Sequence, residues 1–226
     1  MRSTIVAITV ISFSWLSSPP QTPRVPAALL DSANRSPVAV LMQLADAAVP
    51  AGLEIRASDP WQPRRKPDFA LPREPMVPAT ALVDAFNAAH ADYRAAVRDG
   101  VIVIRPIGRH AAYLDAPSTV GHVTVLGVMK AGRDIFAGLD PAVNSPGGIL
   151  GSIMATPEEA GETTQISLDG HGRANMDLLN DLVRQRPSGW YVVSSDDAGP
   201  ARVLKFGFMS VRGVSAEIDL SSRGRK

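Results

Sequence analysis

A helix pattern followed by a hairpin pattern occurs twice in this sequence, and this repeat limits the possible folds more than any other feature. In the first copy, apolar residues recur at the spacing of one helix face, at Leu82, Val83, Phe86 and Ala89. Two apolar segments follow, and the Asp99-Gly100 pair between them favours the tight turn of a hairpin. We therefore predict a helix that begins near Thr80, followed by strands at 93–97 and 101–105.

The second copy of the pattern lies near the end of the sequence. Leu178 and Leu182 each lie 96 positions after an apolar residue of the first helix, and Trp190 lies 97 positions after Tyr93. One strand is predicted before this helix and two after it, at 164–168, 190–194 and 203–211. The predicted fold class is α+β, with two related βαββ-like units in which mixed or antiparallel sheets carry helices on one face.

The first unit also contains an earlier helix and strand. Ser36 and Pro37 form a helix-start signal, because serine caps the first turn and proline suits its first position. Alternation at 53–56 predicts a half-buried strand, and the prolines that follow exclude a regular helix or a central strand. The predicted boundaries are 36–110 for the first unit with a proline-rich surface insertion at 57–78, 118–211 for the second unit, and 212–226 for a flexible polar tail.

The N-terminal segment has the pattern of a secretory signal peptide. Arg2 precedes an apolar stretch from 5 to 16 that is shorter than the roughly 20 residues needed to span a bilayer. Val25 and Ala27 form the best small-residue pair for cleavage, so we predict a signal peptide at 1–27, with an uncleaved anchor as the alternative. The protein is expected to be periplasmic or secreted, with membrane contact only through this segment.

The composition argues against several classes of function. The sequence has no cysteine, which excludes disulfides, thiolate metal sites and cysteine nucleophiles. Its formal net charge is only +1, so no overall field attracts nucleic acid. We expect a globular body that is held together by packing alone and has no nucleic-acid partner.

Four segments of the first unit carry a family pattern. They are 40–45 (VLMQLA), 52–55 (GLEI), 81–86 (ALVDAF) and 100–104 (GVIVI). They resemble the short N-terminal module of secretins and TonB-dependent receptors, known as the STN domain, over about a third of the chain. In that family a helix packs beside a strand with a glycine-led apolar pair, and a second helix leads into a closing hairpin. The resemblance implies a small adaptor that recognises another envelope protein, without catalysis.

The segment Asp169-Gly170-His171-Gly172-Arg173 is the strongest candidate for a functional turn. Two glycines let the backbone approach a ligand, while an acid, an imidazole and a guanidinium project from one turn. The alternative is an ordinary connection from a strand to a helix, with Asn175 capping that helix.

Trp190 and Tyr191 are candidate binding residues of another kind. Neighbours on a strand face opposite sides of the sheet, so we predict that one ring is in the core and the other is exposed. An exposed aromatic ring beside Arg184 and Arg186 is a candidate contact for a partner protein or a glycan.

The sequence lacks the common catalytic and cofactor motifs. The histidines form no zinc-binding pattern, and no GxSxG motif or P-loop is present, so we expect no metal and no cofactor. The function expected is an exported, non-enzymatic binding or adaptor protein that recognises another cell-envelope protein or component. The alternative is an exported hydrolase that uses Asp169 and His171, with the glycine-rich loop at 141–161 as a lid. Such a hydrolase requires both side chains to converge with a third polar group in a concave pocket.

Overall fold

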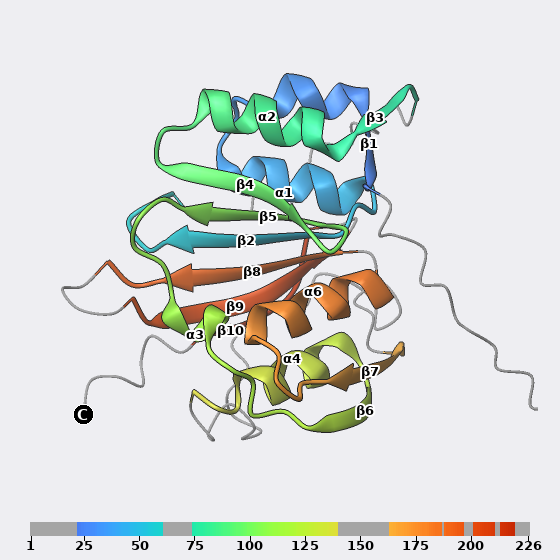
Figure 1. Ribbon diagram of the computed structural model, residues 1–226, viewed down its shortest axis with the longest axis vertical. Coiled ribbons are helices and arrows are strands. Elements are labelled where there is room, and N and C mark those ends of the chain that lie inside the picture. Colours follow the sequence, from blue (N-terminus) through green and yellow to red (C-terminus); the bar gives the residue numbers. More distant parts are fainter. Residues whose placement is uncertain are drawn as a thin grey trace, which may run out of the picture.

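The computed structural model describes residues 22–60, 74–139, 163–186, 188–196, 201–210 and 213–219. Helices and strands are mixed along these residues, and the predicted α+β class is confirmed (Figure 1). None of the helices in the described ranges is long and apolar enough to cross a membrane. The apolar stretch at 5–16 and the loop at 141–161 lie outside the described residues.

The first half of the chain, residues 24–106, contains a short ribbon, three helical segments and a hairpin. Its elements are β1 (Arg24–Pro26), η1 (Ala27–Ser32), α1 (Pro37–Asp46), β2 (Ala51–Arg56), β3 (Met76–Pro78), α2 (Ala79–Ala89), β4 (Tyr93–Arg98) and β5 (Val101–Pro106). Ser36 caps α1 as predicted, since its Oγ accepts a hydrogen bond from the Ala39 N–H at 3.4 Å. Strands β4 and β5 form the predicted hairpin, in which Asp99 and Gly100 have φ values of 48° and 80°.

The second half, residues 122–219, follows a similar order. Its elements, preceded by the short helix α3 (Ala112–Asp115), are β6 (His122–Leu126), α4 (Val128–Phe136), β7 (Gln165–Asp169), α6 (Asn175–Gln185), β8 (Gly189–Ser194), β9 (Val203–Ser210) and β10 (Gly213–Asp219). Each half contains an antiparallel two-stranded ribbon. In the first half β1 pairs with β3, with η1, α1 and β2 between them in the chain, and in the second half β6 pairs with β7, with α4 between them. A helix and then a hairpin follow each ribbon, which is the repeated order predicted from the sequence.

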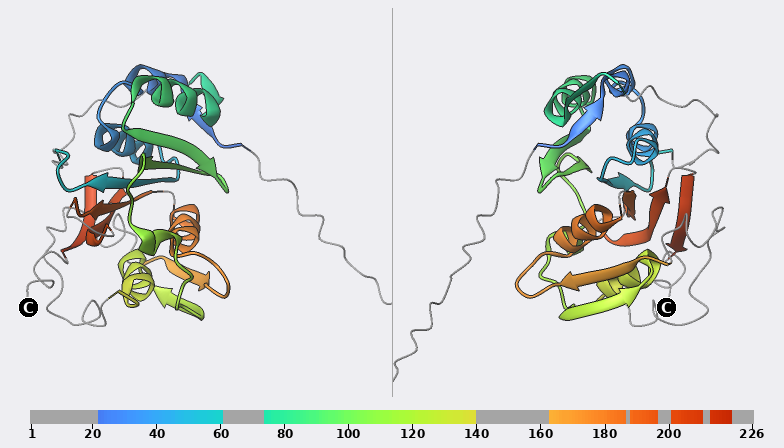
Figure 2. Two further views of the ribbon diagram at one scale, coloured as in Figure 1. Left: turned by 60° about the vertical axis from the view of Figure 1, so that its left-hand side comes forward. Right: turned by 90° about the vertical axis from the view of Figure 1, so that its right-hand side faces the viewer.

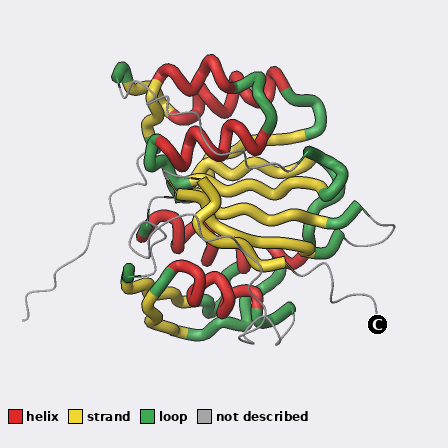
Figure 3. The backbone as a smooth tube through the Cα atoms, turned by 180° about the vertical axis from the view of Figure 1, so that it is seen from behind, coloured by secondary structure: helices red, strands yellow, loops and turns green. Residues whose placement is uncertain are grey.

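The hairpins of the two halves join in one central sheet of six strands, in the order β10-β9-β8-β2-β5-β4 (Figure 3). The junction between the halves is a parallel pairing of β2 with β8, from Ala51 opposite Gly189 to Arg56 opposite Ser194. Strand β2 also pairs parallel with β5 on its other side. The remaining neighbouring strands of this sheet pair antiparallel, so the sheet is mixed.

The helices of the two halves cover opposite faces of this sheet (Figure 2). Helices α1 and α2 pack with Ile102, Tyr191 and their face of the sheet, whereas α4 and α6 pack with Val103, Trp190 and the other face. Within each half the helices lie on one face, as expected. Because the halves share the sheet, both of its faces are buried.

This double coverage corrects the expectation of a half-buried strand at 53–56. Strand β2 lies between β8 and β5, and even the side chain of Glu54 is completely buried. Its carboxylate accepts hydrogen bonds from Arg105 Nε at 3.0 Å and from the Ala111 N–H at 2.5 Å. Arg105 also donates to both carboxylate oxygens of Asp115, at 2.8 and 3.0 Å. A network of charges therefore compensates the buried carboxylate.

Three predicted ranges overlap elements of the structure. Val25 lies in β1 and is 0% exposed, so the range 1–27 predicted for a signal peptide overlaps a strand that belongs to the core. Part of the proline-rich insertion forms β3, in which Pro78 is tolerated because the strand lies in a short ribbon rather than in the central sheet. The predicted flexible tail contains β10, which pairs with β9.

Candidate functional site

Asp169 and His171 meet in the turn between β7 and α6, as their spacing suggested. The Asp169 carboxylate lies 2.7 Å from His171 Nδ1 and accepts a hydrogen bond from the His171 backbone N–H at 3.2 Å. Both side chains are open to solvent, with exposed fractions of 62% and 75%. The pair is a small hydrogen-bonded unit on the surface.

The two glycines of this turn have structural explanations. A Cβ at Gly170 would overlap the carbonyl oxygen of Val120, because the turn passes directly against that backbone. Gly172 has a φ of 68°, which glycine adopts without strain. The glycines therefore form the connection between β7 and α6 and need no ligand to explain them.

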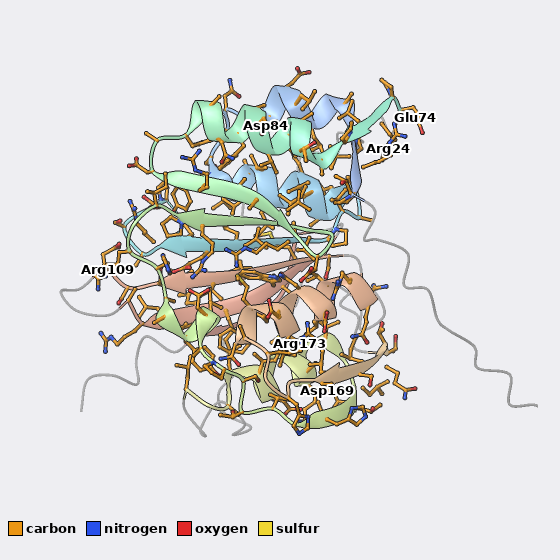
Figure 4. The ribbon with its side chains drawn as sticks, in the orientation of Figure 1. Arg24, Glu74, Asp84, Arg109, Asp169 and Arg173 are labelled. Atoms are coloured by element: carbon orange, nitrogen blue, oxygen red, sulfur yellow. The ribbon has the colours of Figure 1, made fainter. Side chains whose placement is uncertain are left out.

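Arg173, labelled with Asp169 in Figure 4, bonds to helix α6 rather than to this pair. Its guanidinium bonds to the Asp181 carboxylate and to the Asp177 carbonyl oxygen, both on α6. Asn175 is not the cap of α6, because its buried side chain donates to the Tyr113 carbonyl oxygen at 2.9 Å. Instead, the Asp177 carboxylate accepts a hydrogen bond from the Ala174 N–H at the start of this helix.

The arrangement expected of a hydrolase that uses Asp169 and His171 does not form among the described residues. Both side chains are largely exposed, and Arg173 does not join them. Within the same ranges no three or more His, Cys, Asp or Glu side chains come together as a possible metal site.

We predict that removal of the His171 side chain raises the pKa of Asp169. The hydrogen bond from His171 holds this pKa below its usual range, and the charge of nearby His122 lowers it to a smaller extent. A carboxyl-detected NMR titration should therefore show a larger upward shift in His171→Ala than in His122→Ala, toward the ordinary value of about 3.9. An Asp169 titration that is identical in His171→Ala and the wild type contradicts this account.

Trp190 and Tyr191 do face opposite sides of the sheet, but the prediction that one of them is exposed is wrong. Their exposed fractions are 1% and 0%, because helices cover both faces of β8. The Trp190 ring lies over Gly52, and its Nε1–H donates to Asn180 Oδ1 at 3.0 Å. Neither ring is available to a partner, and both belong to the core.

The outer face of the β6–β7 ribbon is a surface that the sequence analysis did not identify. Its side chains are all exposed and come from alternate positions of the two strands, namely His122, Thr124, Leu126, Gln165, Ser167 and Asp169. Leu126 is 63% exposed, the most exposed large apolar side chain among the described residues. This face therefore combines an apolar contact at one end with the Asp169–His171 pair at the other.

Side-chain amides occupy the edges of two other strands. Asn87 accepts from the Ala95 N–H at 2.7 Å and donates to the Ala95 carbonyl oxygen at 3.0 Å, on the outer edge of β4. Gln185 does the same for Ser167 on the outer edge of β7, at 3.0 and 2.8 Å. In the part of the chain that the structure describes, no side chain does this for β6.

A cavity of about 290 Å³ lies where α1 begins and α2 ends. The Tyr93 hydroxyl donates to the Asp59 carboxylate beside it and accepts from the Arg56 N–H at 3.2 Å. Burial, followed by the bond to Asp59, raises the pKa of this hydroxyl. His90 stacks on Phe86 and contacts the Ala33 carbonyl oxygen at 3.0 Å. These polar groups are therefore occupied by bonds within the protein.

No family model matches the chain, and searches of curated proteins and of solved structures also found no match. The fold and the site define the class directly. The chain is an α+β protein with a mixed sheet covered on both faces and an exposed two-stranded ribbon outside it.

Proposed function

We propose that this chain is an exported, non-enzymatic adaptor that binds another cell-envelope protein through the outer face of the β6–β7 ribbon. The observation that carries the proposal is the position of Leu126. This leucine is 63% exposed on a strand whose inward-facing neighbours, Val123 and Val125, pack on the core. Large apolar side chains on a rigid exposed element are typical of protein-binding surfaces.

The first half supplies a second line of support. Helix α1 packs beside β2, which carries Gly52-Leu53, and α2 leads into the hairpin β4–β5. The resemblance to STN modules, which implies a helix beside such a strand and a second helix before a hairpin, supports the proposal. Those modules recognise other envelope proteins, so the resemblance favours an adaptor over an enzyme.

Site-specific photocrosslinking in the native cells tests this proposal. A photoreactive residue at Leu126 is expected to give one reproducible adduct with an envelope protein. The matched control is Ile107, an apolar residue directly after β5 with an exposed fraction of 41%, where no such adduct is expected. Leu126→Asp should then weaken binding of the identified protein about tenfold or more, because a charge replaces an apolar contact. Equal adducts at both positions, or none at Leu126, would overturn the proposal.

A further inference from the structure

We infer that the edge of β6 opposite β7, called the free edge because none of the described strands pairs with it, receives an extended segment of the partner as an additional antiparallel strand. This inference rests on the proposed function, because it specifies how the ribbon makes its contact. The groups involved are backbone N–H and C=O groups rather than the side chains of the outer face alone.

The ladder between β6 and β7 shows which backbone groups are free. Thr124 lies opposite Ser167, and the N–H and C=O groups of Ser167 both bond to Gln185 instead of to β6. In an antiparallel pair such non-bonded positions alternate with bonded ones. The backbone groups of His122, Thr124 and Leu126 therefore point away from β7, toward the free edge of β6.

The edges of β4 and β7 differ from this edge, because each carries one side-chain amide cap. The Asn87 amide bonds to the outward N–H and C=O groups of Ala95 on β4, and the Gln185 amide bonds to those of Ser167 on β7. Strand β6 has the sequence HVTVL, without proline, lysine or an acidic residue, and these are the residues that usually protect an exposed edge. It therefore has the composition of a strand that accepts another strand.

The side chains of β6 indicate the chemistry of the added strand. Val123 and Val125 are half-buried on the inner side, so the residues beside them should be apolar and β-branched. On the outer side Leu126 favours an apolar neighbour. His122 at the other end favours a carboxylate, which accepts a hydrogen bond from the imidazole.

A second copy of this chain fits the edge less well. Twofold pairing about Thr124 places His122 opposite Leu126, a polar side chain against an apolar one. The occupant is therefore a segment of another protein.

The test uses the full chain and the synthetic peptide Ser-Leu-Val-Thr-Val-Glu-Ser, blocked at both ends. Antiparallel to β6, it places its leucine beside Leu126 and its glutamate beside His122. The N–H of its central threonine then faces β6, whereas those of its valines face solvent. N-methylation of the threonine is expected to weaken binding about tenfold or more, and N-methylation of a valine about twofold or less.

The matched change in the protein is Thr124→Pro, which removes an outward N–H that β7 does not use. It should weaken peptide binding about tenfold, whereas Thr124→Ser should change it by no more than about twofold. Amide hydrogen exchange on the wild type adds a readout that does not depend on folding of a variant. The amides of Thr124 and Leu126 should become protected when the peptide binds.

Three outcomes would overturn the inference. One is no binding of the unmethylated peptide, and another is equal loss of binding for both methylated peptides. The third is a dimer of the free chain that Thr124→Pro dissociates, which assigns the edge to a second copy. If one of these outcomes occurs but Leu126 still gives its adduct in cells, only strand addition is rejected. If the adduct is also absent, the proposed function is rejected as well.

Discussion

Gly52→Ala is expected to destabilise the protein by about 3 kcal/mol. A methyl group at this position would overlap the Cε2 and Cζ2 atoms of Trp190. The indole has nowhere to move, because it is buried and its Nε1–H is bonded to Asn180. The clash lies where β2 pairs with β8, which is the junction between the two halves. Urea unfolding followed by circular dichroism measures the loss.

Two further variants show whether the cause is overlap with the indole. Gly121→Ala is the matched control, since its methyl group would meet only His171 at an ordinary contact distance of 3.8 Å. It should change the free energy of unfolding by no more than about 1 kcal/mol. Trp190→Phe should be less damaging in the Gly52→Ala background than in the wild type, because the smaller ring makes room. Additive effects of the two substitutions argue against the proposed clash.

Arg105→Met is expected to destabilise the protein by about 3 to 5 kcal/mol. It leaves the Glu54 carboxylate in the core without a cation, while the N–H of Ala111 remains its hydrogen-bond donor. Thermal or urea unfolding near neutral pH measures the effect. A loss below about 1 kcal/mol would show that water or another group compensates Glu54 in the folded protein.

Lys130→Met is the matched control for loss of a cation. Lys130 pairs with Asp134 on the surface of α4, so its removal should cost no more than about 1 kcal/mol. The double variant Glu54→Leu with Arg105→Met should be more stable than Arg105→Met alone, because it removes the unpaired buried charge.

The same network predicts how stability depends on pH. Burial favours the protonated form of Asp115, but the hydrogen bonds and charge of Arg105 outweigh it and lower the pKa of this carboxyl. A carboxyl with a lowered folded-state pKa stabilises the protein above its unfolded-state pKa, and this contribution is lost as the pH falls through the folded-state pKa. Arg105→Met should remove this part of the acid dependence.

Local patterns identified most of the helices and strands correctly. Helix α2 and the hairpin β4–β5 follow from apolar spacing and from the Asp99-Gly100 turn, because these signals lie within a few residues of one another. Strand β10 was missed although Val214, Ala216 and Ile218 alternate with more polar residues or glycine in the sequence. The polar and basic residues around this strand favour the prediction of a flexible tail at 212–226.

The candidate site was predicted only in part. The Asp169–His171 pair forms because the two residues are neighbours in one turn. The open edge of β6 depends on the β6–β7 pairing and on Gln185 binding to Ser167 from another element. No spacing along the chain indicates contacts of this kind.

The sequence alone determined the α+β class, the repeated order of helix and hairpin, and the turn that brings Asp169 to His171. Only the tertiary structure decided that the two hairpins share one sheet and that their helices cover opposite faces. The physical reason is that strand partners and the burial of a face depend on residues far apart in the chain. Trp190 and Tyr191 are therefore both in the core, and β6 is a strand whose free edge is not capped by any described side chain.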